Sequence, residues 1–351
     1  MKQHTYKTIV ILGGVFDPIH NGHISIYRAI QRKIHPNKFI VTPSKYPPLK
    51  NNLPIASSID RYNMLKLAFN NFKNVEISKY EISKNNNDKS YTYITINHFK
   101  KIYPYSCLYF VVGSDRFNDF KQWKNYKQIL NKCHLIVINR DQNKLTNNIE
   151  NTVYIKIKPI QISSKQLRKI PDKKYLNPKV IKYIQSHHLY MEEQIKSLMS
   201  AHRFQHTLRV CKLAQELAKS INNKLIEKAY IASMYHDIAK EMLESQSRKL
   251  IKSYDKKRFP TFHTTHGLVS AIYAHKYLNI NDKEILNAIK NHVIPNNKPT
   301  TLDMILYCAD KLEPKRTKDD VKNRIAYIRL AKINLKQAFY KLLKETQQHY
   351  K

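Results

Sequence analysis

Two groups of residues in this chain have types and spacings that suit chemistry on phosphates. In the first, Gly13 and Gly14 follow a β-branched run, and His20 and His23 lie three positions apart. Glycines let the backbone approach a phosphate closely, and the start of a helix offers unpaired N–H groups and a positive dipole end. Two imidazoles there can donate hydrogen bonds to the α- and β-phosphates of a nucleotide. The segment 13–23 therefore predicts a phosphate-binding turn between a strand and a helix.

The second group consists of four histidines and two aspartates in the second half of the chain. Divalent metals accept neutral imidazole and carboxylate ligands, and helices packed side by side can bring such residues together. Asp237 could bridge two metals while His236, directly before it, binds one. The metal ligands that we expect are His206, His236, Asp237, His266, His292 and Asp310.

Strand-like and helix-like segments alternate through the first half of the chain. The segments 7–14 and 107–115 are short runs of β-branched and aromatic residues that end in turns, whereas 23–34 and 61–72 have apolar residues at helical spacing. Strands separated by helices imply βαβ units and a parallel sheet. We therefore expect an α/β domain over residues 1–190.

The second half of the chain has only helical patterns. Strand-like alternation ends near residue 160, and prolines fall between the helical segments or at their ends. The segments with apolar residues three or four apart are 203–221, 227–243, 264–278, 282–293 and 301–313. We expect an all-α domain over residues 191–351, with His236 and Asp237 inside the helix 227–243. The join, near 183–194, lacks Gly and Pro.

Composition limits the classes of function. The chain has 351 residues, enough for two cores, and a formal net charge of +36. The charge is spread over both halves and Lys greatly outnumbers Arg, which favours a composition bias with solvated lysines over a nucleic-acid site. No apolar run approaches the ~18 residues of a membrane span. We expect a cytoplasmic protein with no membrane partner and no specific nucleic acid; a homo-oligomer is compatible with the sequence.

The four cysteines are scattered and include no CxxC pair. This pattern predicts reduced thiols that mostly serve packing, and it argues against a disulfide framework or a cysteine-bound zinc.

Residues 1–190 resemble the bacterial nicotinate-nucleotide adenylyltransferases of the (T/H)xGH nucleotidyltransferase superfamily. The segment 13–23 is similar to the superfamily signature, and the other motifs follow in the family's order. They are PPLK at 47–50, RYNMLKLA at 61–68, SYT at 90–92, GSD at 113–115 with Trp123 downstream, ISSKQLR at 162–168, and PKVIKYI at 178–184 with Leu189-Tyr190. The resemblance implies a Rossmann-like fold that transfers AMP from ATP, bound with Mg²⁺, to nicotinate mononucleotide. The products are nicotinate adenine dinucleotide and pyrophosphate.

The resemblance also implies roles for single residues. His20, His23, Lys50 and Arg168 would act on the triphosphate, and Trp123 would stack on the pyridine ring. The substrate-binding residues that it implies are Gly13, Gly14, Phe16, Asp17, Thr92, Gly113, Asp115, Trp123, Ser163 and Ser164.

Two positions depart from the family pattern. Leu49 stands where PPHK has His and cannot donate to a phosphate, while Lys165 replaces the Thr of ISST and could add a phosphate contact. Nicotinamide mononucleotide or another phosphate acceptor therefore remains an alternative substrate.

Residues 195–345 resemble the HD phosphohydrolases, and more closely the symmetrical diadenosine tetraphosphatases. The motifs are RFQHTLRV at 203–210, HDIAK at 236–240, HG at 266–267 with Ala271, and ADKLEPKR at 309–316. The resemblance implies that the six ligands hold one or two divalent metals, iron or manganese, and that diadenosine tetraphosphate is cut into two ADP. Asp237 and Lys240 would be catalytic, and Lys240 and Arg316 would offset the polyphosphate charge.

The identity of the hydrolase substrate stays more open than metal binding. After His292 the sequence VIPNNKPTTLD differs from the family's usual HTxG, so other nucleotides remain possible. The residues Ile238-Ala239-Lys240 after the HD pair argue against the guanosine-alarmone hydrolases, which carry an acidic pair there. A basic RNA-binding or regulatory protein with two vestigial sites is the alternative from a different class.

Overall fold

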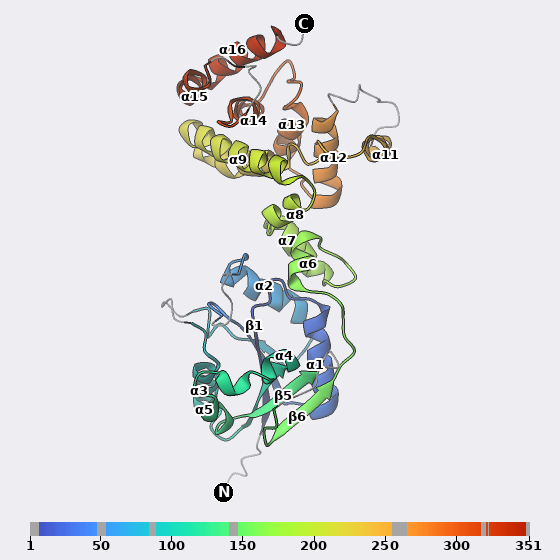
Figure 1. Cartoon of the computed structure of the whole chain (residues 1–351), viewed down its shortest axis with the longest axis vertical. Coiled ribbons are helices and arrows are strands. Elements are labelled where there is room, and N and C mark those ends of the chain that lie inside the picture. The colour runs from blue at the N-terminus through green and yellow to red at the C-terminus, as the bar shows by residue number, and fades with distance from the viewer. Residues whose placement is uncertain are drawn as a thin grey trace. The chain divides into compact units, whose positions relative to one another are not determined.

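A computed structural model describes residues 7–47, 54–83, 89–139, 147–254, 265–316, 321 and 323–348. The chain divides into two compact units, Met1–Tyr190 and Met191–Lys351. Figure 1 shows the strands and helices of the first unit and the helices of the second, and each unit has its own hydrophobic core. Of the residues expected to act on the triphosphate, Lys50 lies outside the described residues, as does its neighbour Leu49.

A parallel sheet forms the centre of the first unit. Within the described residues its order is β3-β2-β1-β4-β5-β6, and every pairing is parallel. The strands are β1 (Thr8–Gly14), β2 (Lys38–Pro43), β3 (Val75–Ile77), β4 (Cys107–Gly113), β5 (His134–Asn139) and β6 (Thr152–Lys156). The predicted α/β fold with a parallel sheet is confirmed.

Helices cover both faces of this sheet, because β1 is apolar on both sides. Val10 and Leu12 pack with α1 (Asn21–Ile34), α2 (Ser58–Phe69) and α7 (Pro178–Ser186). Ile9 and Ile11, which alternate with them, pack with α3 (Thr92–Ile102) and α5 (Tyr126–Leu130). A strand buried on both faces reads as a continuous apolar run, as residues 8–12 do. The shorter helices are α4 (Ser114–Phe117), η1 (Phe120–Gln122) and α6 (Ser164–Lys169).

The described part of the second unit is entirely helical, as predicted. Its main core draws most of its fully buried side chains from α9, α10, α13, α14 and α16. The helices are α8 (Met191–Lys196), α9 (Ala201–Ile221), η2 (Asn223–Leu225), α10 (Ile226–Tyr235), α11 (Glu244–Tyr254), α12 (His266–Leu278), α13 (Lys283–Asn291), α14 (Thr301–Leu312), α15 (Arg324–Ile333) and α16 (Leu335–Gln348).

One expectation about these helices was wrong. The helix expected over 227–243 ends at Tyr235, so His236 and Asp237 follow it in a turn. Ile238 and Ala239 are buried within that turn, which extends the apolar pattern beyond the helix. The apolar periodicity reports burial, and here burial continues after the helical hydrogen bonds stop.

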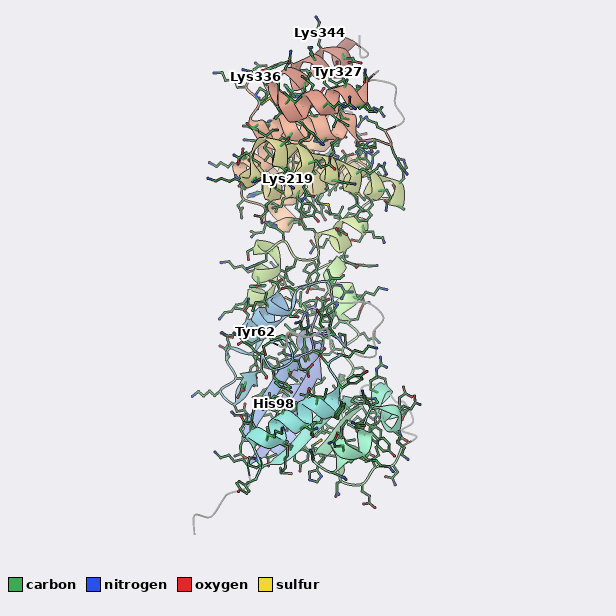
Figure 2. All side chains as sticks on the ribbon, turned by 90° about the vertical axis from the view of Figure 1, so that its left-hand side faces the viewer. Tyr62, His98, Lys219, Tyr327, Lys336 and Lys344 are labelled. Carbon is green, nitrogen blue, oxygen red and sulfur yellow. The ribbon has the colours of Figure 1, made fainter. Side chains whose placement is uncertain are left out.

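Lysines project into solvent from several helices. Figure 2 shows Lys219 of α9 and Lys336 and Lys344 of α16 on the surface, and all three are exposed. Exposed lysines of this kind contribute to the positive charge of the chain. None of the described helices is both long and apolar enough to cross a membrane.

Candidate active sites

The turn between β1 and α1 fixes two imidazoles against backbone amides. His20 is the N-cap of α1, and its Nδ1 accepts a hydrogen bond from the Gly22 amide at 3.1 Å. His23 Nδ1 accepts from the His20 amide at 3.2 Å, and the two ring centroids lie 4.0 Å apart. A neutral imidazole whose Nδ1 accepts a hydrogen bond carries its proton on Nε2. Each ring is therefore oriented to donate from Nε2.

Two glycines allow these rings to lie where they do. A Cβ atom on Gly22 would lie 2.8 Å from His20 Cε1, and one on Gly14 would lie 2.8 Å from the Phe16 ring. Phe16 itself has a φ of 53°, which is uncommon for a bulky residue, and its ring meets His23 edge-on. The tight turn thus depends on glycine at both positions.

Helix α6 is hydrogen-bonded to the same turn from far along the chain. Ser164 Oγ donates to the Pro18 carbonyl at 3.0 Å, and Arg168 Nη1 donates to the Asp17 carbonyl at 2.9 Å. Ser163 caps α6, accepting from the Gln166 amide. The structure therefore places Ser163, Ser164 and Arg168 beside the turn that holds the two histidines.

Asp17 links this turn to other segments of the unit through hydrogen bonds to its carboxylate. Its buried carboxylate accepts hydrogen bonds from the amides of Ile55 and Ala56 at 2.9 and 3.2 Å. The Tyr190 hydroxyl donates to the same carboxylate at 2.8 Å, and burial together with the Asp17 charge raises the pKa of that hydroxyl. A substrate contact through the Asp17 carboxylate stays a prediction, since these partners already hold it.

A cavity of about 570 Å³ opens at the carboxyl ends of β1 and β4. The sheet order reverses between these strands, and ligands of open parallel sheets bind at such a point. The predicted residues in its lining are Gly13, Gly14, Thr92, Gly113 and Trp123. Trp123 is half-buried, and its ring lies 5.1 Å from that of Phe120. Asp115 is exposed, paired with Arg116 at 3.8 Å.

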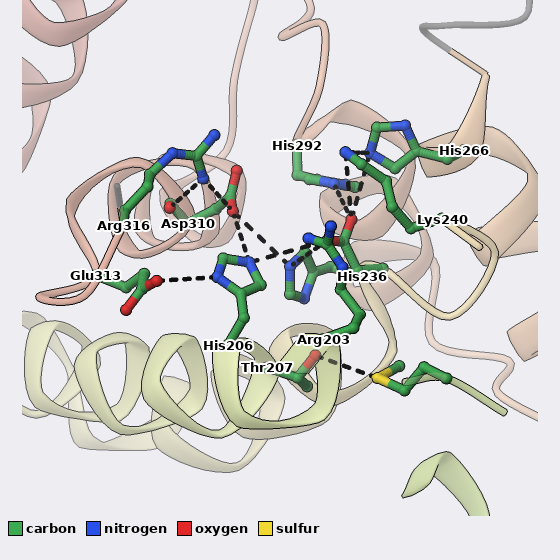
Figure 3. Close-up of polar contacts among 12 residues, drawn as sticks. Arg203, His206, Thr207, His236, Lys240, His266, His292, Asp310, Glu313 and Arg316 are labelled. Carbon is green, nitrogen blue, oxygen red and sulfur yellow. Dashed lines mark hydrogen bonds and ion pairs between the residues drawn. The ribbon is translucent and has the colours of Figure 1, made fainter. Parts of the chain in front are cut away.

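The second site forms where the ends of several helices meet (Figure 3). His236 and His292 directly follow the last residues of α10 and α13, and His266 is the first residue of α12. His206 lies within α9 and Asp310 within α14. Together with Asp237, all six expected ligands are therefore brought to one place.

Asp237 lies between two groups of histidines. Its Oδ1 is 3.3 Å from His266 Nε2 and 3.4 Å from His292 Nε2. Its Oδ2 is 3.6 Å from His236 Nε2 and 3.8 Å from His206 Nε2. This carboxylate is positioned to bridge two cations.

Asp310 joins only one of these groups, since its Oδ1 lies 3.2 Å from His206 Nε2 and 3.9 Å from His236 Nε2. The cage therefore has two parts. We call Asp237 Oδ2 with His206, His236 and Asp310 the His206 half, and Asp237 Oδ1 with His266 and His292 the His292 half. The ligand atoms of His206, His236 and Asp237 lie within 4.8 Å of one another, as do those of Asp237, His266 and His292.

Backbone carbonyls orient two of the histidines. His236 Nδ1 lies 2.6 Å from the Ser233 carbonyl, and His292 Nδ1 lies 2.6 Å from that of Ile289. These carbonyls belong to the last helical turns, which lack intrahelical partners. A neutral ring that donates from Nδ1 has no proton on Nε2. Its Nε2 lone pair therefore faces the cage and is available to bind a metal.

The donor set fits a divalent metal. His206 Nε2, His236 Nε2 and Asp237 Oδ1 are buried and make no hydrogen bond within the described residues. Burial lowers the pKa of His236 to about 4 and also lowers that of His266, which keeps both rings neutral. Burial alone would raise the pKa of Asp237, but the surrounding histidines hold it well below its usual value. Neutral imidazoles and a charged carboxylate are what metal binding requires.

Four cationic side chains surround the cage. Of the two expected, Lys240 Nζ lies 2.9 Å from His266 Nε2 and Arg316 Nη1 lies 2.9 Å from Asp310 Oδ1. Arg203 and Lys311 were not anticipated; Arg203 contacts Asp237 Oδ2 at 2.9 Å and Lys311 contacts Asp310 Oδ2 at 3.3 Å. Both lie in the motifs 203–210 and 309–316, which is the signal that could have found them. These cations can offset the charge of a bound polyphosphate.

Family models match each half of the chain. The model for cytidylyltransferase-like proteins matches residues 11–170, and the model for the HD domain matches residues 203–315. The first match contains both histidines of the turn, and the second contains all six expected metal ligands.

Relatives with both halves are also found. A Mycoplasma genitalium protein named "Probable nicotinate-nucleotide adenylyltransferase/Ap4A hydrolase" is 38% identical over 97% of this chain and 98% of its own length. A Mycoplasma pneumoniae protein of the same name is 31% identical over 95% and 98%. Among solved structures, nicotinic acid mononucleotide adenylyltransferase from Plasmodium falciparum, complexed with NaAD, matches 53% of this chain and 98% of its own, with 25% identity and a TM-score of 0.44.

Proposed function

The chain belongs to the nicotinate-nucleotide adenylyltransferase/Ap4A hydrolase family, and from this premise we propose that it is an enzyme with two separate activities. The first unit transfers AMP from ATP to nicotinate mononucleotide, releasing pyrophosphate and nicotinate adenine dinucleotide. The second hydrolyses diadenosine tetraphosphate to two ADP. The observation that carries the proposal is the presence, in one chain, of a paired-imidazole phosphate turn and a six-ligand cage.

The transfer reaction needs positioning more than covalent chemistry. The phosphate of the mononucleotide attacks the α-phosphorus of ATP in line, so pyrophosphate leaves from the opposite side. His20 and His23 donate from Nε2 to phosphate oxygens, and Arg168 adds a fixed positive charge beside the same turn. Mg²⁺ bound with the ATP offsets further charge. Preorganised donors of this kind stabilise the charge that develops on the leaving group.

The cavity offers contacts that suit the acceptor, nicotinate mononucleotide. Trp123 lines it and offers an aromatic face to a pyridine ring, and Thr92 lies in the same lining at the start of α3. The amino end of that helix favours a negative group such as the nicotinate carboxylate over the neutral amide of nicotinamide. We therefore assign the acid as the preferred acceptor.

The hydrolytic activity rests on the cage. Its imidazole and carboxylate donors would hold one or two divalent metals, for which iron and manganese suit the donor set. When bound, such metals supply Lewis acidity and lower the pKa of a bound water. Asp237 would contribute one carboxylate oxygen to each half of the cage. The carbonyls of Ser233 and Ile289 keep the Nε2 atoms of His236 and His292 directed inward. Lys240 and Arg316 bind phosphate oxygens at the rim.

The test is a crossed assay on the full chain. Pyrophosphate release from ATP with nicotinate mononucleotide and ADP release from diadenosine tetraphosphate are measured for the wild type, His20→Ala and Asp237→Ala. We expect His20→Ala to abolish transfer and keep hydrolysis, and Asp237→Ala to do the reverse. His35→Asn and His202→Ala are matched controls, because both histidines are exposed and Asn tolerates the φ of 50° at position 35.

Either activity can be rejected separately. Failure of the wild type to release pyrophosphate would reject the transferase, and hydrolysis that survives in Asp237→Ala would reject the metal-centred hydrolase. Nicotinamide mononucleotide and other nucleotides in the same panel test the alternative substrates. Tight, sequence-selective RNA binding without either activity would favour the regulatory alternative.

A further inference from the structure

His206, one of the cage histidines, contacts a carboxylate through the ring nitrogen that does not face the cage. Glu313 follows α14 directly and is 1% exposed, and its Oε1 lies 3.1 Å from His206 Nδ1 (Figure 3). The other ring nitrogen of His206 faces Asp310 in the cage. The imidazole therefore stands between a buried carboxylate and the metal ligands.

Glu313 is itself held firmly. Arg209 Nε donates to its Oε2 at 2.6 Å, Arg209 Nη2 donates to Oε1 at 3.2 Å, and the Lys315 amide donates to Oε2 at 3.0 Å. Glu313 is thus paired with the Arg209 guanidinium and held in one orientation.

The two halves of the cage differ in their ligands and in the groups that orient them. His236 and His292 are oriented by neutral carbonyls, whereas His206 is oriented by a carboxylate. The His206 half also contains Asp310, and the His292 half faces the Lys240 ammonium, 2.9 Å from His266 Nε2. The His206 half offers two carboxylates and two imidazoles, whereas the His292 half offers one carboxylate and two imidazoles, of which His266 already accepts from Lys240. The number of available ligands, and not the surrounding charge, therefore favours the His206 half, because three cations pair with its carboxylates; they are Arg203, Lys311 and Arg316.

We propose that Glu313 makes the His206 half the tighter of two metal positions, by fixing His206 with Nε2 toward the metal and strengthening that nitrogen as a donor. A carboxylate behind a ligating histidine acts in this way generally, and loss of such a partner weakens metal binding about 10- to 100-fold. Glu313 is therefore a positioning residue. The inference rests on the proposed metal centre of the hydrolase.

The experiment titrates the metal-stripped full chain with Co²⁺ alone, followed by calorimetry and by visible absorption. The wild type should bind in a tight and a weak phase. Glu313→Gln should weaken the tight phase about tenfold or more and shift the absorption of the first equivalent, with the weak phase unchanged. Glu284→Gln is the control, because Glu284 pairs with Lys228 at 2.7 Å on the opposite end of α13 from His292 and should change neither phase.

Asp237→Ala, which loses a ligand shared by both halves, gives the background from surface histidines. Equal weakening of both phases by Glu313→Gln, or no weakening, would overturn the inference while leaving the metal centre in place.

A second variant, His292→Ala, decides if Glu313→Gln does not fold. It should remove the weak phase and keep the tight one, and loss of the tight phase overturns the inference. A wild type that binds no more Co²⁺ than Asp237→Ala would reject the proposed metal centre itself.

Discussion

Arg61 Nη1 donates a 2.8 Å hydrogen bond to the carbonyl oxygen of Val15, in the turn that carries the paired imidazoles. The same atom donates to the Ser44 carbonyl at 2.8 Å, just after β2. Val15 and Ser44 both line the cavity, whereas Arg61 itself is 1% exposed. Nε and Nη2 bind the Ala56 carbonyl and Ser58 Oγ. One buried guanidinium therefore joins the loops that shape the cavity.

We predict that Arg61→Lys destabilises the first unit by about 3 kcal/mol, because a single ammonium cannot satisfy acceptors that lie on several sides of a planar fork. Urea unfolding of the full chain should show an earlier transition for the first unit. Arg28→Lys, at an exposed position on α1, should change stability by less than about 0.5 kcal/mol. An unchanged midpoint in Arg61→Lys would show that the buried hydrogen bonds contribute little.

The parts that could be predicted from the sequence are those encoded locally. One strand–turn–helix unit contains the apolar run at 8–12, the glycines after it, and His20 and His23. Its conformation depends on interactions between residues that are close in the sequence. The six expected metal ligands could also be chosen from the sequence, because few side chain types bind metals, and the structure brings these six residues together.

The partners that position these residues could not be predicted. Glu313 meets His206 and Arg209 across more than one hundred positions, and Arg61 meets Val15 across 46. Nothing in an amphipathic pattern distinguishes a buried arginine from an exposed one. Similarly, the apolar pattern at 227–243 includes Ile238 and Ala239, which are buried. It could not show that α10 ends at Tyr235, because apolar spacing reports burial and not helical hydrogen bonds.

Trp123 provides a direct signal for acceptor binding. It is the single tryptophan of the chain and lines the cavity. We expect nicotinate mononucleotide to change the intrinsic tryptophan fluorescence, while diadenosine tetraphosphate does not. Trp123→Leu should raise the KM for the mononucleotide about tenfold, equivalent to ~1.4 kcal/mol of stacking, with the KM for ATP nearly unchanged. A parallel rise in both KM values would instead indicate a general disturbance of the cavity.

Removal of metal should separate the two activities. We expect chelator treatment followed by exchange into buffer with Mg²⁺ to abolish hydrolysis and preserve transfer, because among the described residues only the cage groups three or more side chains that could hold a metal tightly. Added Mn²⁺ or Fe²⁺ should restore hydrolysis. The second unit should also gain stability with metal, about 2.7 kcal/mol at a concentration 100-fold above Kd. Hydrolysis that persists fully in Mg²⁺ after chelation would contradict this.

The cysteines give a prediction about pH and thiol chemistry. Cys133, Cys211 and Cys308 are buried, whereas Cys107 is partly exposed. Burial raises the pKa of Cys133 and of Cys308 from 9.0 to about 12, and it also raises that of Cys211. Because the thiolate is the reactive form, a disulfide reagent at pH 8 should label Cys107 alone in the folded protein and all four thiols in urea.

The same shifts determine how stability depends on alkaline pH. A thiol whose pKa is higher in the folded state keeps its proton between pH 9 and about 12, while the unfolded chain loses it. The free energy of unfolding should therefore fall as pH rises through that window, and Cys308→Ala should reduce the slope, although the smaller side chain also lowers stability at neutral pH. Cys107→Ser should remove the fast labelling and leave the slope unchanged. Rapid labelling of a second thiol in the folded Cys107→Ser variant would contradict the burial on which both predictions depend.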